Sequence, residues 1–149
     1  MDRTERIELT TLCLVRRGEQ ILLQNRVKAD WRGYALPGGH VEPGESIVDA
    51  VVGEMKEEPG LTISAPRLCG VKQFPIDGGR YLVFLFRTDR FDGVLRSSEE
   101  GKMEWIPRNH LGAYPCVDDL EELLQVCEQE ELTEFRYTVE NNDWKVQLR

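Results

Sequence analysis

The sequence has few histidines and no closely spaced cysteines. Only two histidines occur in 149 residues, and the four cysteines stand far apart, so no C-x-x-C pair is formed. Zinc sites and disulfide frameworks depend on closely spaced Cys and His residues. The sequence therefore predicts neither of them, and reduced thiols indicate a cytoplasmic protein.

Long apolar runs are also missing. No stretch approaches the roughly 18 apolar residues of a membrane-spanning helix. The opening stretch, MDRTERIELTT, carries three acidic side chains and lacks the apolar segment of a signal peptide. We therefore expect no membrane partner and no secretion signal.

The sequence has fewer basic than acidic residues. The 19 Lys and Arg residues are outnumbered by 27 Asp and Glu residues, and the formal net charge is −8 at pH 7. Proteins bind nucleic-acid polymers by displacing counterions with Lys and Arg. We therefore expect no nucleic-acid polymer as partner. A small phosphorylated molecule is compatible with the charge, because a divalent cation can bridge two negative partners.

The length suits one domain, residues 1–149, with its own core. Alternating apolar residues predict strands, and apolar residues at helical spacing predict helices. The expected strands are 7–16, 20–26, 61–64, 67–76, 80–90, 102–106 and a last hairpin around 141–142, and the expected helices are 46–58 and 117–130. Residues 27–37 are expected to form a loop leading into a short strand, and an irregular loop is expected at 38–44. Helices among mostly antiparallel strands predict an α+β fold with a mixed sheet covered by helices.

The first expected helix has an apolar stripe and a separate acidic face. The stripe consists of Ile47, Val48, Ala50, Val51 and Met55. Glu54, Glu57 and Glu58 stand at i, i+3 and i+4, so they share one face. Like charges at this spacing repel by about 0.2–0.5 kcal/mol per pair. Such a face is either solvated surface or a site that holds a cation.

The segment before this helix favours the cation. Gly38 and Gly39 allow the backbone to approach a ligand closely, and Glu45 adds an acid at the end of the loop. Magnesium prefers oxygen ligands and often binds through a few carboxylates together with substrate phosphates. The combination therefore suits metal-assisted phosphate chemistry, in which a carboxylate or a second metal activates water.

Residues 39–61, GHVEPGESIVDAVVGEMKEEPGL, resemble the Nudix box. The chain matches eight of its nine fixed positions, with Gly39, Glu45, Glu54, Met55, Glu57, Glu58, Gly60 and Leu61. The preceding WRGYALPGG and the strands that follow also resemble the family, so the resemblance covers most of the chain. It implies a Nudix-type α/β/α sandwich around a mixed, mostly antiparallel sheet. It also implies hydrolysis of substrates containing a nucleoside diphosphate, with Mg²⁺ or Mn²⁺.

The resemblance also assigns roles to individual residues. The implied metal ligands are Glu54, Glu57, Glu58, the carbonyl of Gly38 and Glu100. Glu99 is the alternative to Glu100. The implied catalytic residues are Glu54, which also activates water, Glu57, and Glu45, which fixes the geometry of loop and helix.

Two residues depart from the pattern. Gly53 stands where the family has an arginine that orients the box glutamates, so the carboxylates are expected to be less preorganised. A glycine inside a helix also costs about 0.8–1 kcal/mol relative to alanine. Pro59 removes a backbone donor in the last turn, next to Glu58. A domain that binds a nucleotide without hydrolysing it is therefore one alternative to an active hydrolase.

Other stretches resemble the bacterial MutT-like branch, the 8-oxo-dGTP diphosphatases: WRGYALPGGHVE, VKQFPIDGGRYLVFLF and SSEEGKMEWI. This resemblance implies hydrolysis of an oxidised purine nucleotide to the monophosphate and pyrophosphate. The candidate substrate-binding residues are Arg26, Trp31, Tyr34, Gly39, His40, Lys72, Phe74 and Arg80. Aromatic rings stack on a purine and basic groups meet phosphate, but ordinary packing and solvated charges explain each of these residues equally well.

The substrate and the oligomeric state stay open. Pro75 lies fifteen residues after Gly60, a spacing found in relatives that cleave ADP-ribose, so ADP-ribose or another nucleoside diphosphate sugar is the alternative substrate. Dimers are common in the family, but no stretch of this sequence specifies an interface, so a homodimer is only an option.

Overall fold

The computed structural model describes residues 1–149. The strands are β1 (Arg6–Arg17), β2 (Gln20–Arg26), β3 (Gly33–Ala35), β4 (Gly38–His40), β5 (Thr62–Ser64), β6 (Arg67–Ile76), β7 (Gly79–Thr88), β8 (Arg90–Asp92), β9 (Gly101–Pro107), β10 (Glu134–Glu140) and β11 (Asp143–Leu148). The helices are α1 (Ile47–Glu57), the 3-10 helix η1 (Arg108–Ala113) and α2 (Leu120–Glu128).

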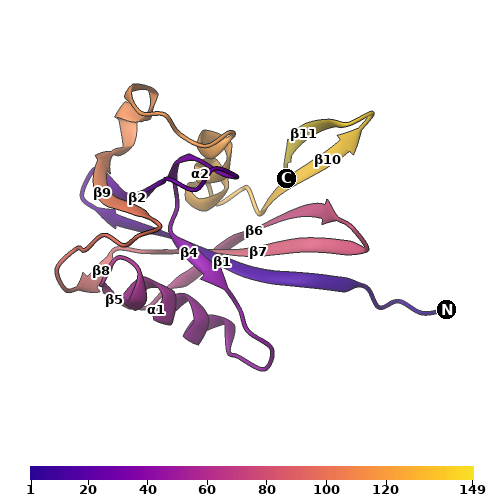
Figure 1. Ribbon diagram of the computed structural model, residues 1–149, viewed down its shortest axis with the longest axis horizontal. Helices are drawn as coiled ribbons and strands as arrows, with labels where there is room; N and C mark the ends of the chain where they lie inside the picture. The colour runs from indigo at the N-terminus through magenta and orange to yellow at the C-terminus, as the bar shows by residue number, and fades with distance from the viewer.

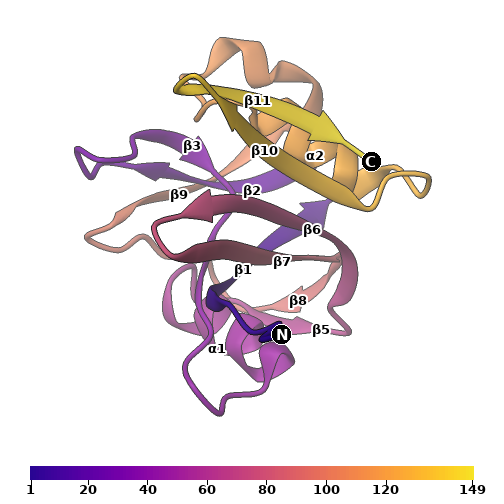
Figure 2. The same ribbon diagram turned by 90° about the vertical axis from the view of Figure 1, so that its right-hand side faces the viewer.

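Nine strands form one mixed sheet that lies between the two α-helices (Figure 1, Figure 2). The strand order is β11-β10-β6-β7-β1-β2-β3, with β4 added to β1 and β9 to β2, and β5 and β8 form a separate pair. Only β1 with β7 and β6 with β10 run parallel. The α+β fold with a mixed, mostly antiparallel sheet is therefore confirmed.

Strand β1 is covered on both faces, as its sequence of apolar residues on both faces requires. Leu14 packs in the cluster that contains α2, and Cys13 and Val15 pack in the cluster that contains α1. The core is thus divided into two layers by the sheet. Every cysteine is a free thiol, and no helix is long and apolar enough to cross a bilayer.

Strand β4 corrects the expected irregular loop at 38–44. Residues 38–40 pair antiparallel with β1, with His40 opposite Thr10 and Gly38 opposite Leu12. A Cβ at Gly38 would lie 2.0 Å from the carbonyl oxygen of Thr11, so only glycine permits this close pairing. Because glycine is depleted in strands, a glycine pair does not predict a strand at this position.

Helix α1 begins and ends where the sequence predicts. The Ser46 hydroxyl accepts a hydrogen bond from the backbone N–H of Asp49 at 3.2 Å, which caps the first turn. Ala50, Val51 and Met55 are buried against the sheet. Val48 was expected in the apolar stripe but is 48% exposed, because its position on the helix turns toward solvent. The burial of one face leaves the glutamates on the outer part of the helix.

The C-terminal hairpin is confirmed and projects beside α2 (Figure 2). Asn141 and Asn142 have φ values of 51° and 68°, which suit the two central residues of a tight hairpin turn. Strand β10 pairs with β6 and places Phe135 opposite Lys72. The hairpin therefore extends the sheet and forms one wall of the recess described below.

Candidate active site

Helix α1 presents Glu54, Glu57 and Glu58 in its last two turns. The side chain of Glu54 is half-buried, and Glu57 is exposed. Backbone donors at the helix end are used internally, since the N–H of Glu58 donates to the carbonyl of Glu54 at 2.9 Å. The three carboxyl groups lie close together at the C-terminal end of the helix.

The Glu54 carboxyl lies against the backbone of Gly39. A Cβ at residue 39 would be 2.3 Å from Cδ of Glu54, so any side chain there would displace the carboxyl. Burial, followed in order of effect by the charges of Glu57, Glu58, Glu100 and Glu45, raises the pKa of Glu54 to about 7. The structure thus brings five of the predicted acidic residues into one electrostatic cluster.

The loop that precedes β9 contacts this cluster through Ser98 and Glu100. The Ser98 hydroxyl donates to a carboxylate oxygen of Glu58 at 2.7 Å and accepts the backbone N–H of Glu100 at 3.2 Å. Glu100 also accepts from Lys28 Nζ at 3.1 Å. Of the two acids considered at this position, Glu100 therefore acts on Glu54, whereas Glu99 is exposed.

Glu45 sits at the entrance to α1 and stabilises the loop. Its Oε1 accepts the backbone N–H of Glu42 at 3.0 Å, and its own N–H donates to the carbonyl of Glu42 at 3.0 Å. These contacts hold the loop that enters α1, and the role of Glu45 in catalysis stays a prediction. Gly38 precedes Gly39 in β4, and a Cβ at Gly38 would meet the backbone of Thr11 and Leu12.

The donor set is chemically suited to a hard divalent cation. Every candidate ligand supplies oxygen, which Mg²⁺ and Mn²⁺ prefer. No three His, Cys, Asp or Glu side chains converge on one point as they stand, so a shared ion requires rotation of the glutamate side chains. Exposed Glu57 has room for this rotation, and a cation would relieve the repulsion that raises the pKa of Glu54.

Arg96 contacts the end of α1 close to the glutamates. Its guanidinium donates to the carbonyl oxygens of Lys56 and Glu57 at 3.0 and 2.7 Å, which neutralises the negative end of the helix. Sequence reasoning missed this residue, because nothing local marks a partner forty residues away. A Cβ at Gly53 would meet no atom within 4 Å, so the position of the missing arginine faces open space.

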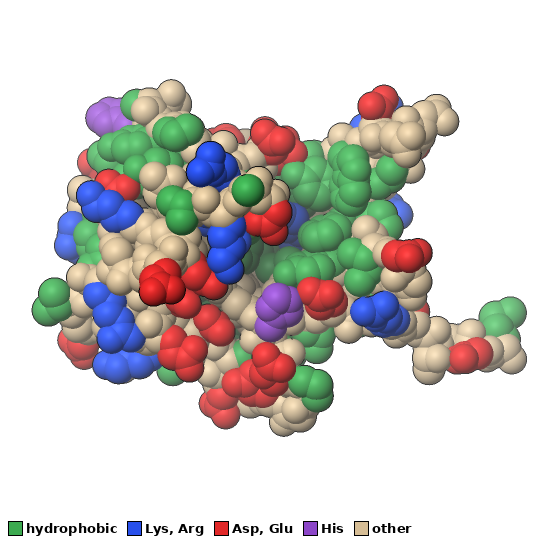
Figure 3. All heavy atoms as spheres, in the orientation of Figure 1, with side chains coloured by type: hydrophobic (Ala, Val, Ile, Leu, Met, Phe, Trp, Pro, Cys, Tyr) green, Lys and Arg blue, Asp and Glu red, His purple; other side chains and the backbone are tan.

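An aromatic recess lies beneath the β10–β11 hairpin (Figure 3). Phe74 stacks on Tyr81 with ring centroids 4.7 Å apart and an angle of 14°, and the edges of Tyr137 and Trp144 approach Phe74 at 6.3 and 5.9 Å. Figure 3 shows hydrophobic side chains gathered between the β10–β11 hairpin and the ends of β6 and β7, and acidic side chains over α1. Sequence reasoning found Phe74 but missed its three partners, which come from different strands.

Lys72 points into the same recess. Its Nζ lies 5.2 to 5.7 Å from the ring centroids of Phe135, Tyr137 and Phe74, which are favourable cation–π distances. Burial lowers the pKa of Lys72 to about 8, and the charge of Asp119 partly opposes this shift. Lys72 therefore belongs with the aromatic rings and lies apart from the carboxylates.

His40 joins the two parts of the site. Its ring centroid is 6.3 Å from that of Tyr81, and its Nε2 is 2.9 Å from a Glu8 carboxylate oxygen. Its neighbour Gly39 faces Glu54 from the same short strand. Strand β4 therefore lies between the acidic cluster and the aromatic recess.

The other candidate substrate residues divide into two groups. Arg26 lies over the ring of Trp31 at 4.5 Å, and Trp31 is 39% exposed, so this pair faces solvent. Tyr34 is buried, and its hydroxyl donates to Glu104 at 2.6 Å, which raises the pKa of the phenol to about 12. Its ring is not free to stack on a ligand.

Arg80 lies at the far turn of β6 and β7. Its guanidinium donates to Glu5 and, at 2.9 Å, to the side-chain oxygen of Gln73. The structure therefore occupies this cation with local partners and does not bring it to the glutamates.

Comparisons with known proteins agree with the arrangement of this site. The model of the NUDIX domain family matches residues 7–140. The human 8-oxo-dGDP phosphatase NUDT18 is 32% identical over 117 residues, which are 74% of this chain but 35% of that protein. The ADP-ribose pyrophosphatase of Methanocaldococcus jannaschii is 35% identical over 102 residues, which are 66% of this chain and 60% of that enzyme.

The fold comparison covers nearly the whole chain. The crystal structure of the MutT protein from Bacillus halodurans aligns with a TM-score of 0.77 and 28% identity, covering 95% of this chain and 97% of that one. The family model matches 134 residues (7 to 140), and the box glutamates on α1 lie within this range. This chain belongs to the Nudix hydrolases, a family of phosphoanhydride hydrolases.

Proposed function

We propose that this Nudix hydrolase acts, with Mg²⁺ or Mn²⁺, on an oxidised purine nucleoside triphosphate such as 8-oxo-dGTP and releases the monophosphate and pyrophosphate. The observation that carries this proposal is the position of β4, with Gly39 against Glu54 and His40 beside Tyr81. A nucleotide lying across this strand would have its phosphates at the carboxylates and its base at the rings.

The glutamates would hold the cation that the reaction needs. A bound divalent cation neutralises phosphate charge and lowers the pKa of water. We assign Glu57, Glu58, Glu100 and the Gly38 carbonyl as its ligands, together with Glu54. The half-buried Glu54, with a pKa near 7, is also suited to accept the proton of the attacking water, because a general base works best near the operating pH.

The base would occupy the aromatic recess. Phe74 and Trp144 offer ring surface, and Lys72 offers a donor for a carbonyl oxygen of the purine. Arg26, stacked on Trp31, and His40 are the groups we assign to the phosphates. Tyr34 is left out of this set because its ring is buried, and Arg80 because it lies at the far turn of β6 and β7, bound to Glu5 and Gln73.

ADP-ribose is the second candidate substrate. The M. jannaschii relative is named for it, and Pro75 stands at the end of β6, opposite Arg80. A nucleoside diphosphate sugar would use the same cation site and the same recess for adenine. The two candidates predict different products, so they are separable by experiment.

The test is hydrolysis by the purified protein of 8-oxo-dGTP, dGTP, other nucleoside triphosphates, ADP-ribose and a dinucleoside polyphosphate in Mg²⁺, with products separated by chromatography. We expect pyrophosphate release and a strong preference for 8-oxo-dGTP over dGTP. Cleavage of ADP-ribose in its place would establish the second candidate. No turnover with Mg²⁺ or Mn²⁺ would favour the alternative of a domain that binds a nucleotide without hydrolysing it, which agrees with the loss of the box arginine at Gly53.

A further inference from the structure

A cavity of about 670 Å³ lies where β1 and β7 end, between the β5–β6 turn and the C-terminal end of α2. Four arginines line it, Arg16, Arg67, Arg87 and Arg90, against only two acids, Asp89 and Glu128. None of its lining residues belongs to the acidic cluster or to the aromatic recess. It is therefore a separate feature, and it concentrates positive charge in a chain whose net charge is −8.

The strand register places these arginines side by side. Arg67 on β6 is directly opposite Arg87 on β7, and Arg87 is paired with Leu14 on β1. Arg16 stands two residues after Leu14, so it projects from the same face of the sheet. Like charges directly opposite each other destabilise a sheet, so this arrangement has a cost that an anion would offset.

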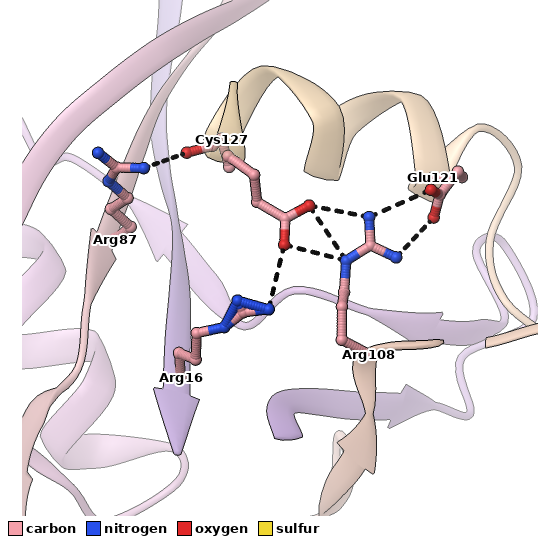
Figure 4. Close-up of polar contacts among 6 residues, drawn as sticks. Arg16, Arg87, Arg108, Glu121 and Cys127 are labelled. Carbon is pink, nitrogen blue, oxygen red and sulfur yellow. Dashed lines mark hydrogen bonds and ion pairs between the residues drawn. The ribbon is translucent and has the colours of Figure 1, made fainter. Parts of the chain in front are cut away.

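The protein itself offsets only part of this charge. The guanidinium of Arg87 donates to the carbonyl oxygen of Cys127 at 3.2 Å, at the end of α2 (Figure 4). Arg16 is 3.6 Å from a carboxylate oxygen of Glu128. That carboxylate is also bound by Arg108 with distances of 2.8 to 3.1 Å, so Arg16 shares it with a closer cation.

Several guanidinium donors are left without protein partners. The Nε of Arg16 is buried and makes no hydrogen bond, although leaving a buried donor unpaired is unfavourable. Arg67 and Arg90 line the cavity and form no side-chain hydrogen bond and no ion pair. Three arginines of the cavity therefore have N–H donors available to an acceptor: Arg16 at its buried Nε, and the exposed Arg67 and Arg90.

The rim of the cavity is fixed in place. The Thr88 hydroxyl donates to the carbonyl of Ser64 at 2.7 Å and accepts the backbone N–H of Arg90 at 3.1 Å. These bonds tie the β5–β6 turn, which carries Ala65 and Pro66, to the end of β7. The arginines therefore project from a rigid frame, which reduces the entropy lost on binding.

We propose that this cavity binds a small polyvalent phosphate anion, such as inorganic pyrophosphate. Guanidinium groups present paired donors that match phosphate oxygens, and the volume falls within the roughly 300–1,000 Å³ of ligand pockets. The lining contains no aromatic ring, so it recognises phosphate and does not recognise a base. The proposal does not depend on the hydrolytic activity proposed above.

The test is calorimetric titration of the purified protein with sodium pyrophosphate, in EDTA and low salt. EDTA removes divalent cations, so the glutamate cluster repels the anion and hydrolysis plays no part. We expect one equivalent of pyrophosphate to bind. The double variant Arg67→Gln/Arg90→Gln, which loses no internal contact, should bind at least tenfold more weakly, and Arg16→Gln should also weaken binding.

The matched control is Arg3→Gln/Arg6→Gln, which removes the same charge from exposed positions at the N-terminus. Its affinity should stay within twofold of the wild type. Absence of pyrophosphate binding to the wild-type protein, or an equal loss in both double variants, would overturn the proposal. A ten-nucleotide RNA that displaces pyrophosphate and binds more tightly would also overturn it, because the ligand would then be a polymer.

Discussion

The Glu54 carboxyl occupies the space into which a side chain at Gly39 would project, with Cδ 2.3 Å from the position of the absent Cβ. The glycine of the box thus permits the glutamate to lie against β4. The first and the central residue of the motif are fifteen positions apart in the sequence, yet they form one contact. This contact sets where Glu54 can act.

Gly39→Ala should therefore reduce activity much more than stability. The added methyl group meets the end of a flexible side chain, which can rotate away at small cost, but Glu54 would leave its position. We expect kcat to fall at least tenfold while Tm changes little. Gly112→Ala is the matched control, because a Cβ there meets no atom within 4 Å. Equal kcat in both variants would show that the contact has no role in catalysis.

Gly53→Arg should stabilise the protein and leave activity unchanged or raise it. A Cβ at this position meets no atom within 4 Å, and replacing a helical glycine gains up to about 0.8–1 kcal/mol. For a domain of this size, the gain corresponds to a rise in Tm of about 2–4 °C. Thermal unfolding and steady-state kinetics check both effects.

Gly53→Ala separates the two contributions of that variant. Alanine supplies helix propensity without a guanidinium, so it should raise Tm to a similar extent and leave kcat unchanged. A sharp loss of activity in Gly53→Arg alone would mean that the carboxylate cluster is adapted to glycine at this position.

The positions along the chain of most strands and of both α-helices could be predicted from the sequence, because their periodicity and caps are local. The helices expected at 46–58 and 117–130 and the hairpin expected around 141–142 are found. Strand β4 was missed, since a glycine pair carries no strand propensity and pairs only because β1 lies beside it.

The candidate site was predictable only in part, for a similar reason. The glutamates share one helix and follow a sequence motif, so they could be identified directly. The partners of Phe74 come from three other strands, and Arg96 reaches α1 from a distant loop. Contacts of this kind depend on strand register, which a single sequence does not specify.

Removal of one carboxylate from α1 should impair cation binding without unfolding the protein. Glu57→Gln and Glu58→Gln keep the shape of each side chain and remove its charge. We expect turnover to fall by more than the roughly 10–100-fold typical when a residue that supports a metal ligand is lost. The melting temperature without metal should stay equal or rise, since repulsion within the cluster is reduced.

Mg²⁺ provides a direct readout of the same site. Mg²⁺ should raise the Tm of the wild-type protein, and this rise should be smaller in both variants but not in Glu99→Gln, an exposed neighbour. The rise should also be smaller at pH 6 than at pH 8, because Glu54, with a pKa of about 7, holds a proton at the lower pH. Parallel losses of Tm and activity would indicate a structural role instead.

The stability contributed by Lys72 should increase with pH. Burial lowers its pKa to about 8 in the folded protein, whereas the unfolded chain has the ordinary value near 10.5. Between these values the unfolded chain binds more protons than the folded protein, so the free energy of unfolding rises with pH. Between about pH 7.5 and about pH 10, the free energy of unfolding measured by urea denaturation should rise more in the wild type than in Lys72→Met. This interval is about the range over which Lys72 titrates in the folded and unfolded protein.

Because wild type and Lys72→Met are compared at the same pH, the titration of all other groups at alkaline pH contributes equally to both proteins and cancels. Lys102→Met is the matched control, because the Lys102 side chain is 71% exposed, and its difference from wild type should not change in the same direction. If Lys72→Met shows no pH dependence, the ammonium is better solvated than its place among three rings indicates. The recess would then be open enough for water to compete with a purine at Lys72.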